Sequence, residues 1–248
     1  MSHPNDDSAA TVDSSSKNLC VLGGIAALLA IALAPAEVII SLLPGVEDRL
    51  ARTVTVVDWF ALFQDHPFLG LRNLGLLNMV GAVLLIPTVL AIYFALKRIP
   101  QTYAVLGAVL FFIGISVYLA GSRAFPMLLL SHQYAIAASE AQRSVLIAAG
   151  QAFLTEAQSR TGILLIEFAF LLISAAMRNG GIFSKATAWA GILGNGLLMT
   201  LEIAFMPPHG IGMVIAAAAG ISIMTWYFLT GRRLLQLGRL SAVNRDCL

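Results

Sequence analysis

Three glutamates lie within stretches of sequence that are otherwise almost entirely apolar: Glu37, Glu167 and Glu202. Glu167 interrupts residues 161–177, which read TGILLIEFAFLLISAAM and are long enough to cross the hydrocarbon of a bilayer as one helix. An ionisable group within a membrane span is costly, so it usually faces a bundle interior or a wet cavity and finds a partner there. Carboxyl groups in such surroundings respond to protons and cations. These residues therefore indicate a site that responds to protons or cations.

The composition is that of an integral membrane protein. Of the 248 residues, 58% are hydrophobic and 11% are charged, against roughly a quarter charged in soluble domains. This length accommodates about six spans of about 20 residues each and leaves no room for a second folded domain. The net charge of +2 is small and its cations are scattered, which argues against nucleic acid binding. The expected partners are the lipid bilayer, a small or lipid-like ligand, and a second copy or another membrane protein.

Six apolar stretches have the length of membrane spans, and each is followed directly by Gly, Pro, Lys or Arg. The two longest connections between them, residues 46–73 and 124–160, carry many polar side chains. We therefore predict an all-α fold, a polytopic membrane helix bundle with six transmembrane helices. The six stretches are residues 19–43, 74–96, 103–120, 161–177, 186–206 and 211–230.

Each of the two long outer connections is predicted to contain a helix. Residues 58–65 read DWFALFQD, and such a cluster of aromatic rings favours the headgroup level, which indicates a short interfacial helix. Residues 139–160 have the apolar spacing of an amphipathic helix that begins at Ser139, with Gln142 three residues later as in a capping box. An alternative for residues 125–138 is a seventh or re-entrant segment.

The two ends of the chain are predicted to lie outside the bundle. Residues 1–17 carry three aspartates and a run of serines, which indicates a disordered cytoplasmic tail. Residues 18–233 are expected to form a single membrane bundle, and residues 234–248 a basic cytoplasmic tail. The only cysteines, Cys20 and Cys247, belong to no metal pattern, and we expect them to be unpaired.

The distribution of basic residues predicts the orientation. With six crossings, both termini share one side of the membrane with the connections at 97–102 and 178–185. That side holds nine of the Lys and Arg residues, whereas the opposite side holds six that are spread through much longer connections. The positive-inside rule therefore predicts a multi-pass protein of the cell inner (plasma) membrane with both termini in the cytoplasm.

The even number of crossings predicts that the three acids share one layer of the membrane. Each lies four to six residues from the outer end of its span, which at ~1.5 Å per residue is about 6 to 9 Å inside the outer boundary. Arg72 and Arg123 are expected to reach this layer as counter-ions, because a guanidinium fork matches a carboxylate. Asn78 and His132 are expected on the same, outer side of the membrane. The predicted ligand-binding residues are Glu37, Glu167, Glu202, Arg72, Arg123, Asn78 and His132.

Three functions are compatible with this layer of charges. The first is the binding or transport of a small or lipid-like ligand at a polar site in the outer half of the bundle. The second is a structural or accessory subunit, whose buried ion pairs only hold the helices together. The third is an intramembrane hydrolase that uses His132 with a neighbouring serine. The sequence contains neither a G-x-S-x-G elbow nor an H-E-x-x-H motif, so we assign no catalytic residue, metal or cofactor.

The run from Asn78 through Arg98, which closes in LAIYFALKR, is followed by a second, glycine-bearing span from Tyr103 to Tyr118. This pattern resembles a bacterial family of small multi-pass membrane proteins of unknown function. The resemblance implies a bundle of six or seven helices in a bacterial inner membrane. It implies no catalytic residues for this chain.

Overall fold

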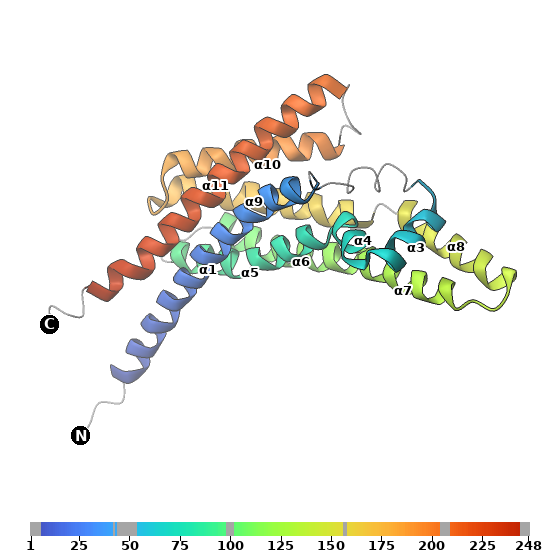
Figure 1. Ribbon diagram of the computed structural model, residues 1–248. Helices are drawn as coiled ribbons and strands as arrows, with labels where there is room; N and C mark the ends of the chain where they lie inside the picture. The colour runs from blue at the N-terminus through green and yellow to red at the C-terminus, as the bar shows by residue number, and fades with distance from the viewer. Residues whose placement is uncertain are drawn as a thin grey trace. The chain divides into compact units, whose positions relative to one another are not determined.

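The computed structural model describes residues 6–41, 43, 54–97, 102–155, 158–203 and 209–243, and within them the chain is all-helical (Figure 1). Within these residues, each of the six stretches predicted as spans lies almost entirely in a helix. The elements in chain order are α1 (Asp6–Ser41), α3 (Val56–Asp65), α4 (Pro67–Asn73), α5 (Leu76–Leu96), α6 (Thr102–Ala120), α7 (Ala124–Ala135), α8 (Glu140–Thr155), α9 (Gln158–Gly180), α10 (Lys185–Ile203) and α11 (His209–Val243).

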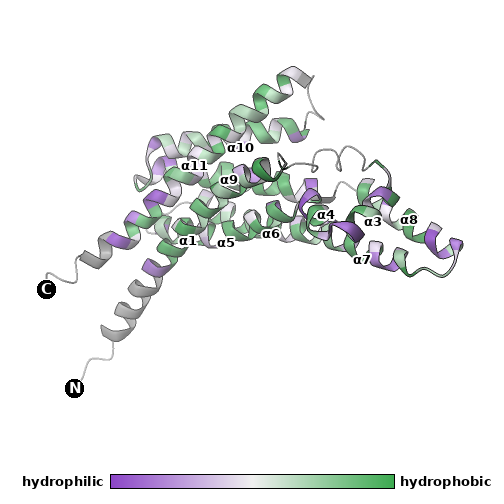
Figure 2. Ribbon diagram, in the orientation of Figure 1, coloured by the Kyte–Doolittle hydropathy of each residue, from purple (hydrophilic) through white to green (hydrophobic). Residues whose placement is uncertain are grey.

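In the part of the chain that the structure describes, four helical stretches are long and apolar enough to cross a membrane: Leu76–Leu96, Thr102–Ala135, Glu140–Gly180 and Gly210–Arg239. Helix α1 contributes a shorter apolar stretch, Lys17–Leu33. Helix α10 is not among the four, because Asn195 and Glu202 lower its mean hydropathy. Figure 2 shows α5 and α6 as almost uniformly hydrophobic, whereas α8 carries interspersed polar residues. The fold is therefore that of a helical membrane protein.

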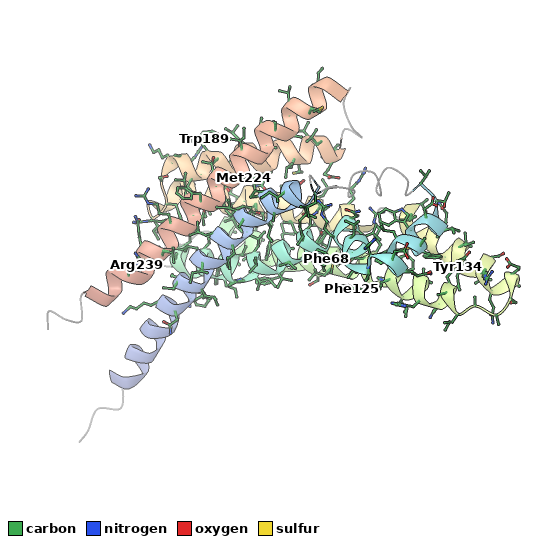
Figure 3. All side chains as sticks on the ribbon, viewed as in Figure 1. Phe68, Phe125, Tyr134, Trp189, Met224 and Arg239 are labelled. Carbon is green, nitrogen blue, oxygen red and sulfur yellow. The ribbon has the colours of Figure 1, made fainter. Side chains whose placement is uncertain are left out.

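Helix α11 exposes a face of large apolar side chains that fits contact with lipid. Ile221, Met224 and Phe228 recur at three- and four-residue intervals and are all exposed, so they lie on one side of the helix. Met213 is 74% exposed and Val214 is 70% exposed. Met224 is labelled in Figure 3 together with Trp189, an exposed ring on α10. Exposed apolar surface of this extent is typical of membrane contact.

Both terminal helices are longer than the sequence predicts. Helix α1 begins at Asp6, within the stretch 1–17 that is predicted to be a tail, and α11 continues through Arg233 to Val243. Acidic residues at a helix start interact favourably with its dipole, and neither extension contains a proline. Gly238 also brings α11 close to α1, since a Cβ at this position would lie 2.5 Å from a methyl group of Val21. The drop in hydropathy at the ends of the predicted spans therefore does not end these helices.

The chain forms two compact units. The first contains residues 1–32, 82–115 and 163–248, and the second contains residues 33–81 and 116–162. In the first unit, glycines allow neighbouring helices to approach closely. Gly107 and Gly114 of α6 face Ile173 and Ile166 of α9, so these two helices are antiparallel. Thr88 of α5 donates a hydrogen bond of 3.0 Å to the carbonyl of Gly23 in α1.

Aromatic rings connect three helices in the core of the first unit. The rings of Phe111 in α6 and Phe170 in α9 have centroids 5.4 Å apart, and Phe170 lies 5.1 Å from the ring of Trp226 in α11. All three side chains are buried. Their tilted and edge-on arrangements are those that aromatic quadrupoles favour. This cluster holds α9 between α6 and α11, which sets the rotation of α9 about its own axis.

The second unit is organised around Val56, Phe60 and Phe63 of α3 and Met127 of α7, which are all buried. Helices α4 and α8 each pack against both α3 and α7. Two hydrogen bonds tie α3 to α7: Ser131 Oγ donates to the carbonyl of Phe60 at 2.9 Å, and Gln64 Nε2 donates to the carbonyl of Ser131 at 3.3 Å. The two long connections thus form a packed helical unit.

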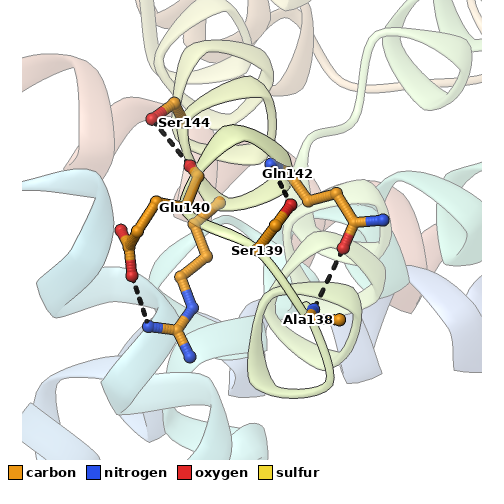
Figure 4. A network of polar contacts seen from close by, with 6 residues as sticks. Ala138, Ser139, Glu140, Gln142 and Ser144 are labelled. Atoms are coloured by element: carbon orange, nitrogen blue, oxygen red, sulfur yellow. Dashed lines mark hydrogen bonds and ion pairs between the residues drawn. The ribbon is translucent and has the colours of Figure 1, made fainter.

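Both helices predicted in the outer connections are present. Helix α3 begins with a capping box of Thr55 and Asp58. Helix α8 begins at Glu140, and its predicted cap, Ser139, accepts a hydrogen bond of 3.3 Å from the backbone N–H of Gln142 (Figure 4). The Gln142 side chain accepts from the backbone N–H of Ala138 rather than from that of Ser139. Residues 124–135 form helix α7; a re-entrant course for it stays a prediction.

The hydrogen bonds to the Asp58 carboxylate predict that the stability of the first turn of α3 depends on pH. The backbone N–H and the hydroxyl of Thr55 each donate to its Oδ2 at 2.7 Å, and these bonds hold the pKa of Asp58 below its usual range. The stabilisation is therefore complete above the ordinary pKa of aspartate and is lost as the pH falls through the lowered value. We expect hydrogen–deuterium exchange at the first amides of α3, relative to intrinsic rates, to accelerate on acidification.

The variant Asp58→Asn should show fast exchange at these amides at every pH. Asp65→Asn, at the opposite end of the same helix, is the control and should keep the wild-type response. An Asp58→Asn protein that responds to acid as the wild type does would contradict this role of the cap.

Candidate functional site

The structure brings two of the three predicted acids together. Glu167 on α9 is only 4% exposed, and its Oε2 has no hydrogen-bond partner among the described residues. Glu202 on α10 is half-buried and close enough to interact electrostatically with Glu167. Both belong to the first unit. That these acids share one layer of a membrane stays a prediction.

The turn between α9 and α10 determines how the two acids meet. Gly181 has φ +66°, a left-handed conformation that favours glycine, and it ends α9. Ser184 caps α10 by accepting a hydrogen bond of 3.1 Å from the backbone N–H of Thr187. Arg233 Nε donates to the carbonyl of Ile182 at 2.7 Å and so attaches this turn to α11. The two helices therefore run back from a fixed turn, and their acids lie at the opposite end.

For the other predicted site residues, the structure gives no position relative to the two acids. Glu37 lies on α1, but its side chain is outside the described residues. The remaining four residues belong to the second unit, so their pairing with the acids stays a prediction.

In the second unit the predicted cations have backbone and side-chain partners of their own. Arg72 is buried, and its guanidinium donates to the side-chain oxygen of Asn73 at 3.0 Å. Arg123 donates to the carbonyl of Leu154 at 3.0 Å and so joins the start of α7 to the end of α8. The side chains of Asn78 and His132 are exposed.

Four buried polar residues of the first unit were not singled out from the sequence: Ser174 on α9, Asn195 on α10, and Trp226 and Thr230 on α11. Within the described part of the chain, Ser174 Oγ, Trp226 Nε1 and Thr230 Oγ1 have no hydrogen-bond partner. Asn195 Nδ2 donates to the carbonyl of Gly191 at 2.8 Å. One sequence signal exists, since Glu167 and Ser174, and likewise Asn195 and Glu202, are seven residues apart and so share a helix face.

Gly191 is the point where these polar groups converge. A Cβ at this position would collide with Ser174 Oγ and would lie 2.6 Å from Trp226 Nε1. The absence of a side chain on α10 thus lets polar groups from α9 and α11 occupy the same space. Because hydroxyl and indole groups can donate hydrogen bonds, this layer offers donors without formal charge, two helical turns from the carboxylates.

Two other kinds of site were considered. Among the described residues, no group of three or more His, Cys, Asp or Glu side chains could hold a metal ion. An open groove of about 560 Å³ lies between the end of α7 and the start of α8 and is lined by Gln133, Ile136, Ala137, Ala141, Gln142, Val145 and Leu146. Its lining is uncharged and includes none of the predicted site residues. The acids on α9 and α10 therefore remain the best candidate site.

Comparison with known proteins adds no assignment, because no family model, curated protein or solved structure matches the chain. The site must be interpreted from its own geometry.

The close approach at Gly191 predicts a specific sensitivity to added volume. In Gly191→Ala, the new methyl group would displace Ser174 or Trp226, and such overpacking costs about 1–3 kcal/mol. Gly220→Ala on α11 is the control, because a Cβ there meets nothing within 4 Å. We expect the thermal midpoint of the detergent-solubilised protein to fall in Gly191→Ala and to stay the same or rise slightly in Gly220→Ala. Equal midpoints in the two variants would contradict the packing described.

Proposed function

We propose that this protein binds a small or lipid-like ligand that carries a positive charge, and that Glu167 and Glu202 supply the opposite charge. The observation that carries the proposal is the buried Glu167 carboxyl group, whose Oε2 has no partner among the described residues while a second carboxyl group lies in electrostatic range. An ionised carboxylate in apolar surroundings, such as that of Glu167, needs a positive charge beside it. A bound cationic group provides that charge.

The surroundings of the acids favour a ligand with apolar parts. Phe168, next to Glu167 in the sequence, is 44% exposed, and Ile203, next to Glu202, is 62% exposed. A cationic head could therefore bind the carboxylates while an apolar body contacts these side chains. Glu202 is half-buried and lies one residue before the end of α10, so the ligand would enter near this end of the helix.

We also propose six membrane crossings, formed by α1, α5, α6, α9, α10 and α11, in the inner membrane with both termini in the cytoplasm. The apolar stretch Lys17–Leu33 supports a crossing by α1. Helix α10 packs along α11, which is apolar enough to span by itself. The basic residues near the termini and the α9–α10 turn support the orientation.

This topology predicts opposite labelling at two exposed positions. In a background with Cys20 and Cys247 replaced by serine, Ala138→Cys lies between α7 and α8, and Lys185→Cys lies at the start of α10. Only α9 crosses the membrane between them. We expect a membrane-impermeant maleimide to label Ala138→Cys on intact cells and Lys185→Cys only after permeabilisation. Labelling of both from the same side would rule out a crossing by α9.

Removing the charge of Glu167 should weaken the binding of a lipophilic cation. The probe is tetraphenylphosphonium, and tetraphenylborate is an anion of nearly the same shape. Losing one member of a buried charge pair costs about 2–5 kcal/mol, and about 1.4 kcal/mol is tenfold in affinity. We therefore expect Glu167→Gln in nanodiscs to bind the cation at least about tenfold more weakly by equilibrium dialysis.

The matched control for this experiment is Glu140→Gln, which removes an exposed carboxylate that pairs with Arg143 on α8. It should bind the cation as the wild type does. A wild-type protein that does not prefer the cation to tetraphenylborate, or a Glu167→Gln protein that binds the cation with unchanged affinity, would overturn the proposed function.

A further inference from the structure

One end of the first unit carries exposed basic side chains next to exposed apolar ones. Helix α9 has Arg178 in its last turn, and α10 begins at Lys185. Both side chains are exposed, and so is that of Arg232 on α11. Figure 2 shows hydrophilic residues at the turn that joins α9 to α10, next to the hydrophobic body of α10. The two acids of the candidate site do not account for this basic end, which is defined by Arg178, Lys185 and Arg232.

Arg178 and Lys185 both lie next to an exposed tryptophan ring. The guanidinium carbon of Arg178 is 5.7 Å from the centroid of the Trp189 ring. Lys185 precedes Trp189 by four residues on α10, so the two side chains share a face of this helix. A cation–π contact holds the guanidinium over the ring and leaves its N–H groups available to an acceptor. The pair of cations is therefore positioned to bind an anion beside the ring.

Helix α11 supplies a third exposed cation at the same turn. Arg233 Nε donates to the carbonyl of Ile182 at 2.7 Å, which attaches α11 to the connection between α9 and α10. Arg233 is half-buried in this contact, whereas its neighbour Arg232 is exposed. All of these residues belong to the first unit. Three helices thus place positive charge at one end of that unit.

Apolar side chains continue from the cations along two of the helices. On α10, Leu193 follows Trp189 by four residues and is 54% exposed. On α11, Phe228 precedes Arg232 by four residues and Met224 precedes Phe228 by four, and both are exposed. Each helix therefore presents a stripe that changes from a cation through an aromatic ring to an aliphatic side chain. This is the order of chemistry in a phospholipid layer from the head group to the acyl chains.

The acids of α9 and α10 are too far away to neutralise the basic end. Among the side chains that the structure describes in the first unit, the acidic ones are Glu167 and Glu202. Glu167 precedes Arg178 by eleven residues, and Glu202 follows Lys185 by seventeen, which is about 16 Å and about 25 Å along the helix axes. Exposed charges at such separations are largely screened, since the Debye length is about 8 Å at physiological ionic strength.

The aspartates at the start of α1 are also remote from Arg232. A Cβ at the preceding residue, Gly231, would lie 3.0 Å from the carbonyl oxygen of Gly24 in α1. Asp13 is the nearest of the aspartates along α1 and precedes Gly24 by eleven residues, again about 16 Å along the axis. The positive charge of the basic end is therefore available to an anionic partner.

We propose that the basic end binds one molecule of an anionic phospholipid such as phosphatidylglycerol, with its phosphate beside Arg178 and Lys185 and its acyl chains along the stripes of α10 and α11. The guanidinium of Arg178 donates to two phosphate oxygens as a fork, whereas the ammonium of Lys185 contributes a point charge. Arg232 adds to the positive potential. The stripes favour a lipid over a soluble phosphate, because only a lipid has acyl chains to bury against them.

The test measures the affinity of the full-length protein for two lipids with the same acyl chains. The protein is delipidated in a neutral detergent and titrated with dioleoyl phosphatidylglycerol or dioleoyl phosphatidylcholine, and bound lipid is counted by native mass spectrometry. We expect the first molecule of phosphatidylglycerol to bind at least about tenfold more tightly than phosphatidylcholine. Arg178→Gln and Lys185→Gln should each weaken phosphatidylglycerol binding about fivefold, and the double variant about thirtyfold. Because both side chains are exposed, the thermal midpoints should be unchanged.

Lys97→Gln is the matched control, because Lys97 is an exposed cation directly after α5 whose Nζ lies 5.6 Å from the centroid of the Phe94 ring. It should bind phosphatidylglycerol as the wild type does. Equal losses in Lys97→Gln and Arg178→Gln would show only a general attraction by positive charge and would overturn the site.

Two further outcomes would overturn the proposal. The first is a wild-type protein that binds both lipids with equal affinity. The second is displacement of phosphatidylglycerol by an equal concentration of glycerophosphoglycerol, which is the same head group without acyl chains, since a site for a soluble phosphate would not need the apolar stripes. We expect no displacement.

Discussion

The burial of a carboxyl group in an apolar helix bundle is the constraint on which the rest of this protein depends. Glu167 is almost inaccessible to solvent, and a second carboxyl group lies in electrostatic range. A carboxyl group buried in this way is stable only when a proton or a nearby positive charge neutralises it. The packing of α9 fixes this burial, because Phe170 is held between Phe111 and Trp226 one helical turn away. The same packing turns Ser174 towards Gly191.

Close helix approach and polar burial have a common origin in this chain. Glycines on α6, α10 and α11 remove side chains where neighbouring helices meet, so atoms of the partner helix fill the space, and at Gly107, Gly114 and Gly194 the nearest of these belong to isoleucines. At Gly191 the groups that fill it are a hydroxyl and an indole N–H rather than methyl groups. A bundle built only for stability would place apolar atoms at such a contact, since replacing buried polar groups by well-packed apolar ones is often neutral or stabilising. The retained polar atoms thus support a functional role for the interior.

The sequence predicts the helices well where hydropathy and helix stops coincide. The second and third predicted spans agree with α5 and α6 to within about two residues, the usual uncertainty of a helix boundary. Helices α1 and α11 extend beyond the first and last predicted spans because a fall in hydropathy at Lys17 and Arg232 ends a membrane-like stretch without ending a helix. Counting crossings predicted that Glu167 and Glu202 share a layer of the membrane, and this stays a prediction. It could not identify Ser174, Trp226 or Thr230, since the burial of such residues depends on helix rotation and on the contact at Gly191.

The most direct test of the central claim is infrared difference spectroscopy of the purified protein in nanodiscs, recorded with and without tetraphenylphosphonium. If the acids exchange a proton for a cation, binding should remove the C=O band of a protonated carboxyl group and add carboxylate bands, and Glu167→Gln should show neither change. A wild-type spectrum in which the cation binds without any loss of the protonated carboxyl band would contradict the account.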